Sequence, residues 1–127
     1  MILYEGISGK KTVRDKLLSA KLLAVSPSVS VYPGDFLGIF PGRLRYIDME
    51  PAGAIQGPVQ GLWLDRSEVK GKLHWMKAAK SGEQTNVCLV WEGVNEVKGE
   101  KTFCQYWRIL VVATRHIMPF DRLVRPA

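Results

Sequence analysis

The sequence contains only two cysteines, Cys88 and Cys104, and no Cys-x-x-Cys pair. Both lie among apolar residues of the kind found in strands, which predicts buried, reduced thiols and excludes a disulfide-stapled scaffold. Histidine is equally scarce, with His74 and His116 alone, and neither stands at a known ligand spacing from a cysteine. We therefore expect no metal site.

Long apolar runs are also missing. No stretch approaches the roughly 18 consecutive apolar residues that cross a bilayer, and the N-terminus lacks the basic and then apolar order of a secretion signal. The sequence has no Gly-x-Ser-x-Gly, no phosphate-binding loop and no His-Glu-x-x-His. These absences predict an intracellular protein without a membrane association and exclude the commonest hydrolase and nucleotide-binding motifs.

The composition is that of one folded domain. The chain has 127 residues, 46% of them hydrophobic and 24% charged, which is enough to bury a core. Eighteen lysines and arginines against 12 acidic residues give a net charge of +6, but the basic residues are dispersed. We expect an acidic or protein partner, and nucleic-acid binding that is at most weak and non-specific. Nothing in the sequence fixes the oligomeric state.

Hydrophobic periodicity predicts a mostly β chain with one short helix. Val13, Leu17 and Leu18 recur at helical spacing, so a helix is expected over residues 11–20, as an N-terminal extension of residues 1–20. Residues 21–127 are expected to form the β domain. Its predicted strands cover residues 22–25, 35–40, 44–47, 61–64, 87–91 and 105–114.

Glycine and proline mark the expected turns and loops. Pro33-Gly34 and Pro41-Gly42 bracket one predicted strand, and residues 48–60 form the longest expected loop. The polar stretch 93–102 separates two apolar strands, which predicts a long hairpin over residues 87–114 whose strands pair centrally in the domain.

Four segments, in order along the chain, resemble the SET domain of protein-lysine methyltransferases. Residues 31–42 are similar to the family's turn and strand that end in Glu-Tyr-x-Gly-Glu, and Leu62 to Asp65 with Trp75 are similar to its Asp-containing strand and the segment after it. Asn86 begins a strand as the family's Pro-Asn does. Residues 107–123 are similar to its Arg, apolar strand, Ala-x-Arg-Asp-Ile-x-Pro pattern. The resemblance implies a SET-like β-clip of short strands and long loops.

The resemblance also implies where S-adenosylmethionine would bind, and those positions have changed. The family's cofactor-loop glycines correspond to the segment Leu22, Leu23 and Ala24, where side chains obstruct a close backbone approach. Its cofactor-binding Asn-His corresponds to Lys77 and Ala78, which replaces an amide that donates and accepts by an ammonium that only donates. Asn86 is the one residue that remains of the family's cofactor-binding positions. We therefore expect no cofactor.

The tyrosines that line the family's lysine channel correspond to Phe40, Arg125 and Ala127. Because each lost transition-state contact costs about 10²–10³ in rate, these degenerate positions predict a chain without catalytic residues. The leading interpretation is a non-catalytic SET-like protein-interaction module, associated with chromatin in the nucleus as the family is. Two alternatives stay open: a divergent S-adenosylmethionine-dependent lysine methyltransferase, and a small basic β-barrel that binds nucleic acid. The candidate binding-surface residues are Arg43, Arg45, Tyr46 and Trp75.

Overall fold

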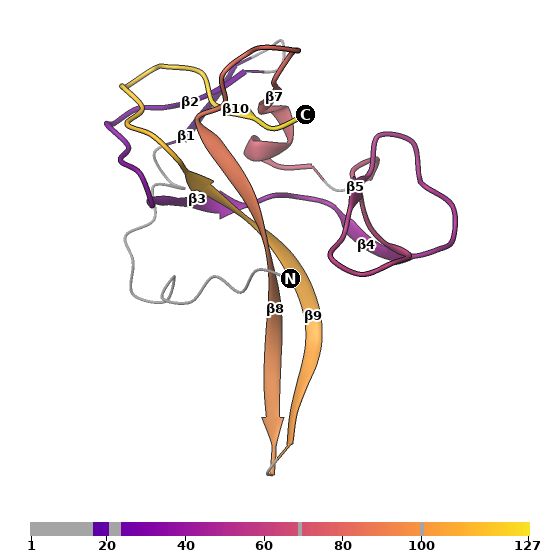
Figure 1. Ribbon diagram of the computed structural model, residues 1–127. Coiled ribbons are helices and arrows are strands. Elements are labelled where there is room, and N and C mark those ends of the chain that lie inside the picture. The colour runs from indigo at the N-terminus through magenta and orange to yellow at the C-terminus, as the bar shows by residue number, and fades with distance from the viewer. Residues whose placement is uncertain (1–16, 21–23, 69, 100) are drawn as a thin grey trace.

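The computed structural model describes residues 17–20, 24–68, 70–99 and 101–127. In this part of the chain the structure is mostly β, as predicted (Figure 1). The strands are β1 (Leu17–Ala20), β2 (Ala24–Pro27), β3 (Phe36–Ile39), β4 (Arg43–Tyr46), β5 (Ile55–Gln56), β6 (Leu62–Asp65), β7 (Lys77–Ala78), β8 (Val87–Lys98), β9 (Lys101–Ala113) and β10 (Val124–Arg125). One 3-10 helix, Lys72–Trp75, precedes β7.

Small sheets of short strands make up the fold. One three-stranded sheet has the order β3-β9-β8 and another has the order β4-β6-β5, while β1 pairs with β2 and β7 pairs with β10. All the pairings are antiparallel except that of β7 with β10, which join segments far apart in sequence. Figure 1 shows β4 and β5 to one side of the β8–β9 hairpin, with β2, β7 and β10 gathered around its base. Within the described residues, no helix is long and apolar enough to cross a bilayer.

The β8–β9 hairpin confirms the predicted pairing but corrects its length and place. Its ladder runs from Val87 opposite Ala113 to Lys98 opposite Lys101, so the polar stretch expected to be a loop is mostly strand. The stretch includes the β-branched residues Val94, Val97 and Thr102, which favour strands, and its ladder continues that of the apolar part of the hairpin. Gly99, with φ of +63°, makes the turn. Strand β9 is central in its sheet, whereas β8 lies at the edge.

The prediction of a helix over residues 11–20 is wrong for residues 17–20. Leu17 to Ala20 form strand β1, which pairs with β2 in the register Leu17 opposite Pro27, and residues 11–16 lie outside the described part. Leu17 is buried, so tertiary packing with an antiparallel partner overrides a helical periodicity that is too short to stabilise a helix. Strand β2 continues to Pro27, beyond the predicted end at residue 25, while residues 22 and 23 lie outside the described part. The expected loop 48–60 contains the short strand β5.

The turn expected at Pro33-Gly34 is present. Asp35 donates its backbone N–H to the carbonyl oxygen of Tyr32 at 3.0 Å, and the Asp35 carboxylate accepts from the Tyr32 N–H at 2.9 Å. Gly34 has φ of +90°, which a side chain would disfavour at this place in a turn. This turn directs β3 onto β9.

The core lies where β3, β9 and the C-terminal segment meet. Its fully buried side chains come from both ends of the sequence, which is why short strands suffice to hold the domain together. The largest of them are Phe40, Leu17, Leu37, Leu62, Ile109, Leu110, Ile117 and Leu123.

Asn86 ties the C-terminal segment to the start of β8. Its side-chain oxygen accepts the Val124 N–H at 2.8 Å and its amide donates to the Arg122 carbonyl at 2.9 Å. Its backbone N–H donates to the Val124 carbonyl at 3.0 Å, and its carbonyl accepts from Thr114 at 3.0 Å. The sequence marked Asn86 as the start of a strand, and the structure adds that it fixes β10.

Truncating Ile109 is expected to destabilise the domain. Ile109 is fully buried on the central strand, so Ile109→Ala is expected to cost about 2–5 kcal/mol in the free energy of unfolding through lost burial and a cavity. Ile39→Ala, at a 39% exposed site on neighbouring β3, is the matched control and is expected to cost much less. Urea unfolding of both variants gives the comparison. Equal costs would contradict this assignment of the core.

Asn86→Ala is expected to loosen the C-terminus selectively. It removes two hydrogen bonds and leaves the Val124 N–H and the Arg122 carbonyl without their partner, at a cost of about 1–3 kcal/mol. Amide hydrogen exchange at Val124 is expected to accelerate more than exchange in β9. Gln84→Ala, at an exposed site nearby in sequence, is the control. An unchanged exchange rate at Val124 would show that Asn86 does not hold β10.

Candidate functional site

Phe40 and Arg125, two positions where the resemblance places tyrosines, lie together in the structure. Phe40 follows β3 and is buried, with its backbone N–H donating to the Ile109 carbonyl at 2.9 Å. Arg125 lies on β10, whose pairing with β7 holds it opposite Ala78. The guanidinium carbon of Arg125 lies 5.4 Å from the centre of the Phe40 ring, within the range of a cation–π contact.

A second arginine approaches the same ring. Arg66 directly follows β6, and its guanidinium carbon lies 4.7 Å from the Phe40 centroid. One of its terminal nitrogens donates to the backbone carbonyl of His74, in the 3-10 helix, at 2.8 Å. Four separate elements therefore meet at one place, and we call Phe40, Arg66, His74 and Arg125 the guanidinium cluster.

The guanidinium cluster contains buried polar atoms without a hydrogen-bond partner, two of which, the arginine Nε–H groups, can only donate. Arg66 Nε, Arg125 Nε and His74 Nδ1 are all shielded from solvent, and none has a hydrogen-bond partner in the described part of the chain. Such orphaned atoms are rare in folded proteins, because an unmade hydrogen bond leaves the full desolvation cost of the group.

Burial and mutual repulsion lower the pKa values of the titratable groups in this cluster. Burial lowers the pKa of Arg66, and burial together with the charge of Arg66 lowers the pKa of Arg125. The pKa of His74 is lowered by burial and then by the charges of Arg66, Lys70 and Arg125. Because a guanidinium stays protonated at neutral pH, the cluster holds two permanent positive charges beside a histidine that favours its neutral form.

Among the described residues, no carboxylate forms an ion pair with Arg66 or Arg125. Asp65, the residue before Arg66, accepts from the Ser67 N–H at 3.0 Å and from its hydroxyl at 2.7 Å, and its other oxygen lies 3.1 Å from Arg45 Nε. Hydrogen bonds from Ser67 and the charges of Arg45 and Arg43 lower the pKa of Asp65, although its burial acts in the opposite direction. Asp65 is therefore ionised and directed toward other partners.

The positions expected to face a cofactor are only partly described. Leu22 and Leu23 lie outside the described residues, and Ala24 begins β2. Lys77 and Ala78 form β7, and the Lys77 ammonium contacts the Glu83 carboxylate at 2.5 Å. Glu83 also accepts from the Lys80 N–H, and these contacts lower the pKa of Glu83. The Asn86 side chain donates one hydrogen bond to the C-terminal segment and accepts another from it.

The four candidate binding-surface residues do not form one patch of free groups. Arg43 pairs with Glu68 at 3.0 Å and Arg45 pairs with Asp65, so both charges have partners. Tyr46 is 69% exposed at the end of β4. Trp75 is half-buried in the 3-10 helix, edge-on to His74, with Lys70 Nζ 5.6 Å from its ring centre.

An open groove of about 500 Å³ adjoins the guanidinium cluster through Arg125. We call it the C-terminal groove, because the last three residues line one of its walls. Trp91 is held in it by an edge-to-face contact with Trp107, with ring centres 6.5 Å apart. Its lining residues are Gly53, Ala54, Ile55, Gln56, Cys88, Leu89, Trp91, Arg125, Pro126 and Ala127. Burial raises the pKa of Cys88, so this thiol is protonated and a poor nucleophile.

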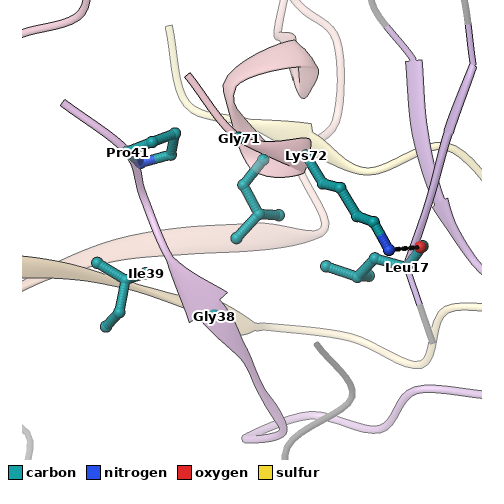
Figure 2. Close-up of a pocket in the computed structure, with 7 residues that line it drawn as sticks. Leu17, Gly38, Ile39, Pro41, Gly71 and Lys72 are labelled. Carbon is teal, nitrogen blue, oxygen red and sulfur yellow. Dashed lines mark hydrogen bonds between the residues drawn. The ribbon is translucent and has the colours of Figure 1, made fainter. Parts of the chain in front are cut away.

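A second hollow, of about 410 Å³, lies between β1, β3 and the start of the 3-10 helix. Figure 2 shows its polar side chain, Lys72, directed toward β1, where Nζ donates to the Leu17 carbonyl at 2.9 Å. The other side chains that line it are apolar, among them Ile39, Pro41 and Leu73. Apart from Lys72, whose ammonium is hydrogen-bonded to Leu17, the described residues that line this hollow offer no acid, base or nucleophile. Across the described residues, no three His, Cys, Asp or Glu side chains gather to hold a metal.

Sequence reasoning singled out Phe40, Arg125 and Ala127 but missed Arg66 as a site residue. Arg66 belongs to no motif in the sequence. The structure shows that Asp65 and Arg66 have separate partners. Only the three-dimensional contact with Phe40 identifies Arg66.

The sequence matches no family model, and no curated protein matches it. The structure of the chain is similar to a solved structure, the methyltransferase domain of human PR domain-containing protein 2, with a TM-score of 0.56 and 17% sequence identity. The similarity covers 86% of this chain and 73% of that domain. At this identity the match shows a shared fold and not a shared activity. The chain therefore has the SET-like fold that the sequence resemblance implied.

Proposed function

We propose that this chain is a SET-like module that does not transfer methyl groups and that binds another protein. The observation that carries this proposal is the guanidinium cluster, two of whose members, Phe40 and Arg125, occupy positions aligned with the family's tyrosines. A lysine methyltransferase must admit a lysine side chain, which is an ammonium at neutral pH, and bring its deprotonated amine to the cationic sulfonium of the cofactor. Arg66 and Arg125, both against Phe40, oppose the entry of any further positive charge.

The position aligned with the cofactor-binding asparagine supports the same proposal. Lys77 carries an ammonium, pairs with Glu83 and offers no acceptor to a ligand. Asn86 is the one position at which the sequence keeps a residue of the family's cofactor-binding pattern. Its side-chain amide is hydrogen-bonded to the C-terminal segment. Neither residue is arranged to recognise S-adenosylmethionine.

A protein partner fits the charge distribution better than a nucleic acid does. Arg43, Arg45, Lys77 and Arg108 each pair with a carboxylate, which breaks up any continuous basic stripe on the described surface. A nucleic-acid-binding domain concentrates its cations along a path that follows the phosphates. Association with chromatin would, in this proposal, come through a protein contact.

The purified chain is expected neither to bind S-adenosylmethionine nor to methylate lysine peptides. Calorimetry with the cofactor and a radiolabel transfer assay on histone and other lysine peptides measure both, with an intact SET methyltransferase as the positive control. A dissociation constant in the low micromolar range, or label on a lysine, would contradict the proposal and favour the divergent methyltransferase. Tight, sequence-selective binding of oligonucleotides at physiological salt would favour the nucleic-acid alternative.

A further inference from the structure

The two arginines of the guanidinium cluster differ from the other paired arginines of the described chain. Arg43, Arg45 and Arg108 each contact a carboxylate. Arg66 and Arg125 contact only backbone carbonyls and the Phe40 ring in the described residues, and each keeps a buried Nε without an acceptor. Carboxylates of the chain therefore pair with these other arginines, and among the described residues none pairs with Arg66 or Arg125.

Both guanidinium groups lie beside the same aromatic ring. Both guanidinium carbons lie close to one ring, so they cannot be farther apart than the sum of their 4.7 and 5.4 Å distances to its centre. A planar guanidinium presents its Nε and one terminal nitrogen as a fork that matches two oxygens of a carboxylate. An anion between the forks would accept from the orphaned donors and relieve the repulsion between two permanent charges.

The C-terminal groove indicates which kind of molecule would present the anion to the arginines. Arg125 belongs to both the guanidinium cluster and the groove, whose walls include the apolar side chains of Ile55, Leu89 and Trp91. A ligand that begins at the arginines can therefore continue along an apolar surface. An extended peptide with an acidic residue beside apolar residues has this chemistry, and the net charge of +6 favours its approach.

We propose that the guanidinium cluster binds a carboxylate side chain of an acidic peptide segment, whose neighbouring apolar residues occupy the C-terminal groove. This inference rests on the proposed function and names the chemistry of the partner. A carboxylate suits the half-buried cluster better than a phosphate dianion does, because the dianion loses more hydration energy on entering it.

Peptide pools with one fixed residue test the proposal. Each pool contains decapeptides of random sequence around a central glutamate, glutamine, phosphoserine or lysine, and binding of the purified chain to each immobilised pool is measured. We expect about tenfold stronger retention by the glutamate pool than by the glutamine pool. Arg66→Gln and Arg125→Gln are each expected to abolish this preference. Arg115→Gln removes the same charge from an exposed arginine and is expected to keep it.

Each contrary outcome has its own meaning. Equal binding of the glutamate and glutamine pools, no binding of either, or a preference for phosphoserine would overturn the carboxylate site while leaving the proposed interaction module standing. Preference for the lysine pool, with label transferred from S-adenosylmethionine, would instead overturn the proposed function. Urea unfolding monitors the fold of each variant, and Arg125→Gln, on a two-residue strand, decides the matter if Arg66→Gln does not fold.

Discussion

The candidate site depends on the attachment of the C-terminal segment to the rest of the domain. Asn86 holds Val124 and Arg122, β7 pairs with β10, and Leu123 donates its backbone N–H to the Val25 carbonyl at 2.8 Å. These contacts join residues that are far apart in sequence, and their result is that Arg125 lies against Phe40. Without them the C-terminal groove would lose the residues from Arg125 onward, and the guanidinium cluster would lose Arg125.

This attachment also explains how a chain of short strands forms a stable structure. A two-stranded ribbon is marginal in water, and β10 alone contains two residues. The strands gain stability because β9 lies between β3 and β8, and because side chains from β1 to the C-terminus share one core. The protruding end of the β8–β9 hairpin is the exception: in Figure 1 it extends away from the other strands.

The sequence predicted those elements whose pattern is local. Alternating apolar residues located β3, β4, β6, β8 and β9, and Pro33-Gly34 located a turn, because strand periodicity and turn geometry depend on neighbours in the chain. It failed at Leu17, where a strand partner overrides helical spacing, and it missed β7 and β10, which are too short to carry a pattern. For the site, Phe40 and Arg125 came from resemblance. Arg66 could not be found, because its role depends on folding and not on any motif.

The most direct test of the central claim is the response of the arginine side chains themselves. Buried Nε–H groups exchange slowly with water, so NMR can follow the Arg66 and Arg125 Nε–H resonances while glutarate or 1,5-diaminopentane is added at constant ionic strength. An anion-selective cluster predicts that glutarate shifts both resonances together, that the diamine shifts neither, and that exposed Arg115 responds to neither. Shifts of Arg66 and Arg125 with the diamine, or none with glutarate, would contradict the account.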